Sequence, residues 1–316
     1  MSGHGHAVRC LLVLTAIAVG GCSVTRSEQL DYRPIHTLYE LFETTYFAEG
    51  AFFSNDARLK LSPSARNGLK VPYALLLSAL KQTSLQPLRD IVLKDGGIDN
   101  ILVGARNFAF TDGLGPVSFD ACYIIKTSRE IPALRTLLTF DPEVQYDGRP
   151  IWMTSFTYGG DRPQPITASI TQTGRYIVLG TRSDVTSIVA GRLTGSSPSP
   201  TGSVKLRDFP EILSAPAWGY RNYRSSYRGE FRDYIEDIQV DRNATGLLFW
   251  VDQGSNSVHL RYMTETDERT PTRFRDMPFS EVQAGVWETR FELLDTEERG
   301  NRLFASFWLL GFGFVV

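Results

Sequence analysis

Pairs of strand-like segments joined by short turns constrain the fold of this chain more than any other sequence feature. The pairs are residues 100–111 with 117–127, 143–146 with 149–158, 166–172 with 175–181, and 245–252 with 257–264. Their turns contain glycine, as in Asp147-Gly148 and Thr173-Gly174, and such turns between apolar runs predict antiparallel hairpins. The chain is therefore expected to build antiparallel sheets.

Helical spacing appears between and before these hairpins. Ser128 is the predicted N-cap of a helix over Arg129–Thr139, and Ser183 that of a helix over Asp184–Gly191. Further helices are predicted near residues 35–46, 72–94 and 280–284. The expected fold class is α+β, with antiparallel sheets, helices packed on one face, and two similar-sized units.

A low-complexity stretch, TGSSPSPTGS at residues 194–203, is the best internal boundary. It predicts a helical start plus a first α+β unit at 35–195, a linker at 196–204, and a second α+β unit at 205–316. The order hairpin, helix, further strands occurs on both sides, and FAFTDG from Phe108 and FWVDQG from Phe249 enter their turns similarly. This organisation resembles families of exported bacterial proteins of unknown function built from paired α+β units. Internal duplication is one explanation of it.

The amino-terminal residues have the layout of an export signal. A weakly basic start precedes the apolar run LLVLTAIAVGGC, which begins at Leu11 and ends at Cys22. This run is too short to span a bilayer as a stable helix, so residues 1–21 are predicted to be a signal peptide. The polar residues 22–34 then form a tether before the folded body.

The end of this signal, Val19-Gly20-Gly21-Cys22, resembles the lipobox of bacterial lipoproteins. The resemblance implies cleavage before Cys22, acylation of its thiol and new amino group, and a mature chain held on a membrane by lipid. Ser23 stands where an aspartate would resemble the inner-membrane retention signal. This favours the outer membrane, facing the periplasm, in a host with two membranes. The alternative is an ordinary signal peptide cleaved near Gly20, which leaves Cys22 as a free or disulfide-bonded thiol.

Charge and cysteine content exclude several classes of protein. The net charge of −2 provides no basic field, so nucleic acid is not an expected partner. The expected partners are a membrane, reached through the N-terminal lipid, and an envelope protein or polymer. After Cys10 leaves with the signal and Cys22 is acylated, Cys122 stands alone, so the core must hold the fold without disulfides. Cys122 lies in an apolar run and is expected to be a buried, unreactive thiol.

No catalytic, cofactor-binding or metal-ligating residues are predicted. Of the four histidines, His36 and His259 remain after the signal is removed, and no H-x-x-x-H or C-x-x-C spacing occurs. His259 lies in an alternating strand and is expected to face solvent. Ser78 and Lys81 match the S-x-x-K of penicillin-binding proteins, but the glycine of the family's K-T-G is absent, so an amphipathic helix is the interpretation.

The most unusual composition is WGYRNYRSSYRGEFRDY, at residues 218–234. Read as a helix, it forms an aromatic stripe flanked by guanidinium groups, a surface suited to an anionic ligand or a glycan. The candidate residues for this surface are Tyr220, Arg221, Tyr223, Arg224, Tyr227 and Arg228. The alternative is tyrosines that pack under arginine stems in a locally neutral segment.

The carboxyl-terminal run LFASFWLLGFGFVV, residues 303–316, carries no charge. It fits a strand buried on both sides; the alternative is an exposed apolar edge that meets a membrane or a partner. The sequence as a whole predicts a lipid-anchored, non-enzymatic envelope protein that binds or scaffolds other molecules. The alternative is an envelope hydrolase acting on glycans through two carboxylates about 5–10 Å apart across a groove.

Overall fold

The computed structural model describes residues 49–54, 63, 97–110, 116–140, 144–146, 149–158, 164–194, 211, 215–222, 244–252, 255, 257–264 and 279–292. Several predicted features lie outside the described residues. They are the signal peptide with Cys22, the tether, the helices near 35–46 and 72–94 with Ser78 and Lys81, the linker at 196–204, and the run at 303–316.

Antiparallel strands form most of the described part of the chain, which also contains two α-helices of 9 and 11 residues. The first strands are β1 (Glu49–Ser54), β2 (Ile98–Phe110), β3 (Pro116–Thr127), β4 (Val144–Tyr146), β5 (Arg149–Tyr158), β6 (Gln164–Thr173) and β7 (Tyr176–Gly180). The later strands are β8 (Ala217–Asn222), β9 (Ala244–Val251), β10 (Ser257–Thr264), β11 (Ser280–Gln283) and β12 (Val286–Glu292). The helices are α6 (Pro132–Phe140) and α7 (Ser183–Leu193). The predicted combination of antiparallel strands with helices is confirmed.

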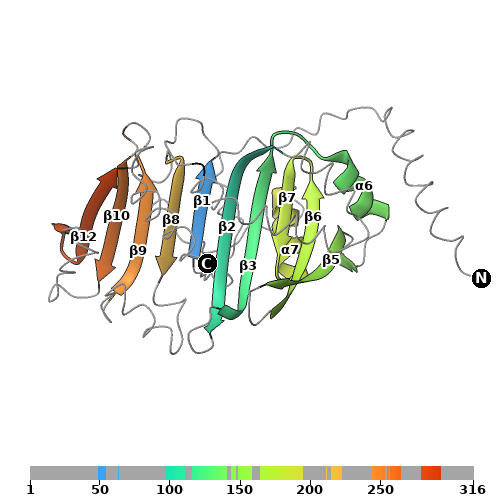
Figure 1. Cartoon of the computed structure of the whole chain (residues 1–316), viewed down its shortest axis with the longest axis horizontal. Coiled ribbons are helices and arrows are strands. Elements are labelled where there is room, and N and C mark those ends of the chain that lie inside the picture. The colour runs from blue at the N-terminus through green and yellow to red at the C-terminus, as the bar shows by residue number, and fades with distance from the viewer. Residues whose placement is uncertain are drawn as a thin grey trace, which may run out of the picture.

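The strands join in one hydrogen-bonded order, β11-β12-β10-β9-β8-β1-β2-β3-β7-β6-β5-β4 (Figure 1). The strand at the centre is β1, where Ala51 lies opposite Val103 of β2 on one side and Gly219 of β8 on the other. Strands that precede the predicted linker and strands that follow it therefore share a single ladder of backbone hydrogen bonds.

The same strand order occurs on both sides of the β1–β8 pair. On one side the order outward is β1-β2-β3-β7-β6, and on the other it is β8-β9-β10-β12-β11. Residues 111–115 separate β2 from β3, and residues 252–256 separate β9 from β10. The later hairpins, β6–β7 and β11–β12, each close through two residues, one of them a glycine with positive φ: 54° at Gly174 and 71° at Gly285. The two halves thus share connections as well as order.

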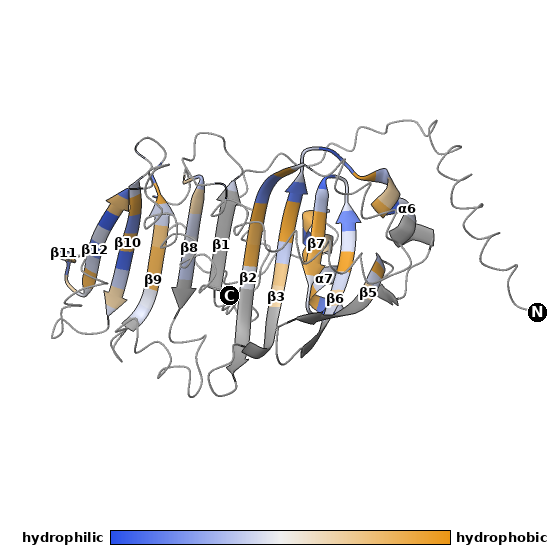
Figure 2. Ribbon diagram, in the orientation of Figure 1, coloured by the Kyte–Doolittle hydropathy of each residue, from blue (hydrophilic) through white to orange (hydrophobic). Residues whose placement is uncertain are grey.

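Both faces of the central strands are buried. All residues of β7 are buried, as are the five consecutive residues 121–125 of β3. Neighbouring residues of a strand face opposite sides of the sheet, so uninterrupted burial means that both sides are covered. This explains why these strands read as continuous apolar runs rather than as alternating ones (Figure 2). Cys122 has no exposed surface, as the sequence predicts, and burial raises the pKa of its thiol.

Helix α7 packs into the larger hydrophobic cluster of the core. The cluster joins Val185, Val189, Ala190 and Leu193 of α7 with Leu102, Cys122, Ile124, Tyr176, Val178, Ala215, Trp218, Leu248 and Trp250. A buried polar contact fixes the helix to β6, because Ser169 Oγ and Thr186 Oγ1 share a hydrogen bond of 2.6 Å and Ser169 also donates to Gly180 O. The core thus links a helix that precedes the predicted linker to strands that follow it.

Two predicted helix starts are wrong. Helix α6 begins at Pro132, a residue favoured in the first turn, while Ser128 Oγ donates to Asp99 Oδ1 at 2.7 Å instead of capping a helix. Ser183 lies inside α7, whose N-cap is Arg182. The Arg182 side chain hydrogen-bonds Asp184 in the first turn and thereby lowers the pKa of that carboxyl, against the opposing effect of partial burial.

The predicted helix at 280–284 is also wrong, because these residues form β11 and the following turn. The tight turn at Ala284-Gly285 returns the chain onto β12, with Ser280 opposite Glu288 and Glu281 opposite Trp287. All side chains of β11 are exposed, so a helix here would have no apolar face to bury. Pairing with β12 therefore decides the local structure.

Replacement of Gly219 by alanine is expected to destabilise the centre of the sheet. A Cβ at this position would meet the ring of Phe249, which lies directly opposite on β9 and is itself buried. Overpacking of this kind costs about 1–3 kcal/mol in the free energy of unfolding, measurable by urea denaturation.

The matched control is Ser280→Ala on the exposed β11, which should change stability by less than about 0.5 kcal/mol. In a double-mutant cycle, Phe249→Leu should lower the free energy of unfolding less in the Gly219→Ala background than in the native chain. The smaller side chain relieves the clash between the alanine Cβ and the ring of Phe249. Additive losses from the two substitutions would contradict the proposed contact.

Candidate functional site

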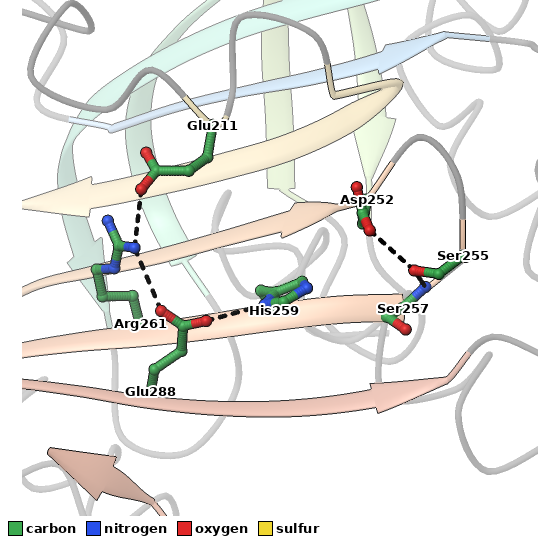
Figure 3. A network of polar contacts seen from close by, with 7 residues as sticks. All are labelled: Glu211, Asp252, Ser255, Ser257, His259, Arg261 and Glu288. Atoms are coloured by element: carbon green, nitrogen blue, oxygen red, sulfur yellow. Dashed lines mark hydrogen bonds and ion pairs between the residues drawn. The ribbon is translucent and has the colours of Figure 1, made fainter. Parts of the chain in front are cut away.

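A polar network occupies one face of the sheet at β10 and β12 (Figure 3). Side chains at alternate positions of a strand share a face, so His259 and Arg261 of β10 lie on the same side. In the register of the sheet, Glu288 of β12 lies opposite Arg261, and Trp250 of β9 lies opposite His259. Glu211 approaches this face from the segment before β8. We call Glu211, His259, Arg261 and Glu288 the β10–β12 network.

One arginine nitrogen connects both carboxylates of the network. Arg261 Nη2 donates to Glu211 Oε1 at 2.9 Å and to Glu288 Oε2 at 3.2 Å. The other oxygen of Glu288, Oε1, lies 2.9 Å from His259 Nδ1. The exposed fractions of the side chains are 18% for Arg261, 20% for His259, 22% for Glu288 and 33% for Glu211. The network is therefore mostly shielded from water, which strengthens its charge interactions.

Trp250 orients the two basic groups. Its ring stacks on the His259 imidazole with centroids 4.9 Å apart and an angle of 11° between the planes. The Arg261 guanidinium carbon lies 4.9 Å from the Trp250 ring centroid, within the range of a cation–π interaction. Trp250 itself is buried in the main core, so the network rests on a fixed part of the sheet.

The geometry of the two carboxylates favours ion pairing over catalysis. Glu211 and Glu288 both bond Arg261 Nη2, so their bonded oxygens lie within about 6 Å of each other. The two catalytic carboxylates of a glycosidase have a similar separation. A glycosidase pair, however, faces a sugar bond, whereas Glu211 and Glu288 both face Arg261. Glu211 Oε2 and Arg261 Nε are buried and make no hydrogen bond, so the contact between these two residues is a single hydrogen bond. The arrangement is suited to holding residue 211 on the sheet.

The described residues contain neither a metal-binding cluster nor a membrane-spanning helix. No three His, Cys, Asp or Glu side chains of this part of the chain lie close enough together to hold a metal ion. None of its helices has the length and apolar content needed to cross a membrane.

The predicted Arg/Tyr surface is described only at its start. Tyr220 and Arg221 lie in β8, so the helical interpretation is wrong for residues 218–222, which pair with β1 and β9. Tyr220 packs against the main core cluster, and burial raises the pKa of its hydroxyl. The other candidate residues lie outside the described part of the chain; they are Tyr223, Arg224, Tyr227 and Arg228.

Sequence reasoning missed the network. His259 was expected to face solvent, yet it is four-fifths buried, stacked on Trp250 and bonded to Glu288. The available signal was limited to two polar residues, His259 and Arg261, which lie two positions apart and therefore on one face of an alternating strand. Their partners on β9, on β12 and at residue 211 depend on the register of the sheet.

Comparison with known proteins identifies no relative by sequence: no protein family model matches the chain, and no curated protein sequence is significantly similar to it. Partial structural likeness is found to crystal forms of the protein TP0453. Form I has a TM-score of 0.43 and 8% identity over 89% of this chain and 99% of that chain. Form III has a TM-score of 0.40 and 10% identity over 85% and 97%, and form IV 0.40 and 11% over 85% and 96%. These values establish no shared role, so the function is argued from this chain's own residues.

Replacement of Arg261 by methionine is expected to destabilise the protein by about 1–3 kcal/mol in urea denaturation, because two mostly buried carboxylates then lose their shared cation. The matched control is Arg135→Met, whose partner Glu130 lies 3.0 Å away on the surface; it should cost under about 0.5 kcal/mol. Adding Glu211→Gln and Glu288→Gln to Arg261→Met should recover part of the loss. No recovery would show that the guanidinium stabilises the fold by packing rather than by charge.

Proposed function

We propose that this chain is a lipid-anchored, non-enzymatic component of the bacterial cell envelope that binds or scaffolds other molecules. The observation that carries the non-enzymatic part is the bridging of Glu211 and Glu288 by Arg261. A hydrolase would need two neighbouring carboxylates, and the two in this network are both ion-pair partners of Arg261. An envelope hydrolase acting on glycans is the competing function, and it requires a second pair of acids facing a groove.

The proposed location follows from the amino-terminal residues. The run from Leu11 and the residues Val19-Gly20-Gly21-Cys22 support export, cleavage and acylation at Cys22. Two or more acyl chains hold a protein on a bilayer firmly, since each buried methylene contributes about 0.8 kcal/mol. Ser23 supports placement on the outer membrane, facing the periplasm. The polar residues 22–34 then act as the tether of the folded body.

We also propose that the body consists of two similar-sized units, at 35–195 and 205–316, with helices packed on one face of the shared sheet. The repeated order, β1-β2-β3-β7-β6 and β8-β9-β10-β12-β11, supports an origin by duplication. A rotation of 180° about an axis that is perpendicular to the sheet and passes between β1 and β8 would place each strand of one half on its counterpart in the other. Because β1 and β8 are antiparallel, this rotation also matches the strand directions. A rigid platform of this kind suits scaffolding better than catalysis in a deep cleft.

Substitution of Cys22 by alanine is expected to abolish lipid attachment. The acceptor thiol is then absent, so radiolabelled palmitate should not be incorporated and the leader should remain in the mass spectrum of the purified protein. The matched control is Cys122→Ala, which removes a buried thiol and should leave labelling unchanged. An unmodified amino terminus in the native protein would overturn the anchored role.

Replacing Arg221, Arg224 and Arg228 by alanine is expected to weaken retention on isolated cell envelope by several-fold, if the Arg/Tyr surface binds anionic groups or glycans. A variant that begins at Ser23 removes the contribution of the lipid, and co-sedimentation with envelope gives the bound fraction. Replacing the exposed Arg129, Arg135 and Arg182 removes the same charge elsewhere and is the control. Equal retention of both triple variants would exclude this surface.

A further inference from the structure

We propose that the outer edge of β11 binds the same edge of a second copy of this chain, so that two sheets join antiparallel about a two-fold axis at Val282. Two observations carry this inference. β11 differs from its counterpart in the first half by one inserted residue, and that residue exposes an apolar side chain at the end of the sheet. The proposal concerns association of the folded chain and does not depend on lipid attachment at Cys22.

Equivalent hydrogen bonds align the two halves residue by residue. Thr127, at the end of β3, donates to Arg175 O in the β6–β7 turn from its backbone N at 2.9 Å and from Oγ1 at 3.0 Å. Thr264, at the end of β10, donates in the same two ways to Gly285 O in the β11–β12 turn, at 2.8 and 3.4 Å. Arg175 and Gly285 are each the second residue of a two-residue turn. β6 and β11 are therefore equivalent strands.

Val282 has no counterpart in β6. Three residues of each strand can be matched by counting back from the turn along the pairs with β7 and with β12. The β6 residues are Thr173, Gln172 and Thr171, and their β11 equivalents are Gln283, Glu281 and Ser280. Val282 falls between two of these equivalents as an extra residue, where the register shifts as in a β-bulge. A bulge at a sheet edge redirects a side chain, so the insertion gives this edge a surface that β6 lacks.

The inserted residue lies at the end of the sheet (Figure 2). Val282 is 54% exposed, and among the described residues no other large hydrophobic side chain is exposed. Within the described part of the chain, β11 pairs with β12 on one side, and an edge strand presents N–H and C=O groups on the other. In the first half, Thr171 Oγ1 instead donates to Pro150 O of β5 at 3.1 Å. The edge of β11 thus offers a place for an added strand.

The sequence of β11 is complementary to itself. In an antiparallel pair centred on Val282, the two Val282 side chains lie opposite each other, and Glu281 lies opposite Gln283 of the second copy. Apolar pairs directly opposite stabilise a sheet, whereas opposed like charges destabilise it, and this register opposes no like charges. A two-fold contact also occupies both edges at once, so association through β11 ends at two copies.

The chain already uses this geometry at its centre. β1 and β8 occupy equivalent places in the two halves and pair antiparallel, with Ala51 opposite Gly219. The proposed contact repeats such a join at the end of the sheet. A strand of four residues buries far less than the roughly 1,000 Å² of a stable interface, so the association is weak and reversible.

Cysteine crosslinking in the full chain tests the contact, because a disulfide traps a weak dimer. Under mild oxidation, Val282→Cys should form a covalent dimer, since its thiols face each other across the axis. Ser280→Cys is the matched control on the same exposed strand; in this register it lies about 13 Å from its own copy along the strands. The dimer yield of Val282→Cys should exceed that of Ser280→Cys, and the background from the native cysteines, by about fivefold or more.

A charged variant supplies a second measurement that needs no added thiol. Val282→Asp would place two carboxylates opposite each other, so the dimer fraction in sedimentation equilibrium should fall about threefold or more. Ser280→Asp adds the same charge away from the axis and should lower it less. Equal crosslinking at both positions, or an unchanged dimer fraction in Val282→Asp, would overturn the contact. Crosslinking of Val282→Cys to a different envelope protein in place of its own copy would also overturn it and assign the edge to a foreign strand. None of these outcomes bears on Cys22.

Discussion

The double pairing of β1 is the interaction on which the rest of the structure depends. β1 bonds β2 on one side and β8 on the other, and these neighbours come from opposite sides of the predicted linker. Without β1, the strands β2–β7 and β8–β12 would each present an unpaired edge, which in water invites aggregation. With β1 in place, the core cluster runs across the join, from α7 through β3 to Trp218 and Trp250. A short strand near the beginning of the folded body thus unites the two halves.

The sequence predicts the hairpins well because their signals are local. Turn residues such as Gly174 and the apolar runs beside them lie within a few positions of one another, and β6, β7, β9 and β10 appear close to where they are expected. Helix starts are predicted less well, although Ser128 and Ser183 both have the sequence surroundings of an N-cap. In the fold, Ser128 bonds Asp99 instead, and Ser183 lies inside α7. The pairing of β1 with β8 was not predictable, because it joins residues about 170 positions apart and no pattern at either strand specifies its partner.

The candidate site was unpredictable for the same physical reason. His259 and Arg261 are polar residues at alternate positions of β10, but their role depends on the residues that lie opposite them. The register supplies Trp250 from β9 and Glu288 from β12, and the segment before β8 supplies Glu211. Polar residues at alternate positions of an antiparallel strand commonly face solvent, so the expectation of exposure followed this pattern and missed the tertiary contacts. Conversely, the burial of Cys122 was predictable, because the residues around it, 121–125, form an apolar run.

The two halves share a strand order but differ in the side chains that their equivalent strands present. In the core cluster that contains α7, β3 and β7 contribute apolar side chains such as Ile124 and Val178. At the corresponding places in the second half, β10 and β12 present the network of His259, Arg261 and Glu288, which in the hydropathy colouring makes these strands more hydrophilic than β3 and β7 (Figure 2). The first half therefore packs apolar side chains at this place, whereas the second half forms ion pairs around Arg261. If the halves arose by duplication, one has an apolar core at this place and the other has charged contacts that hold Glu211 on the sheet.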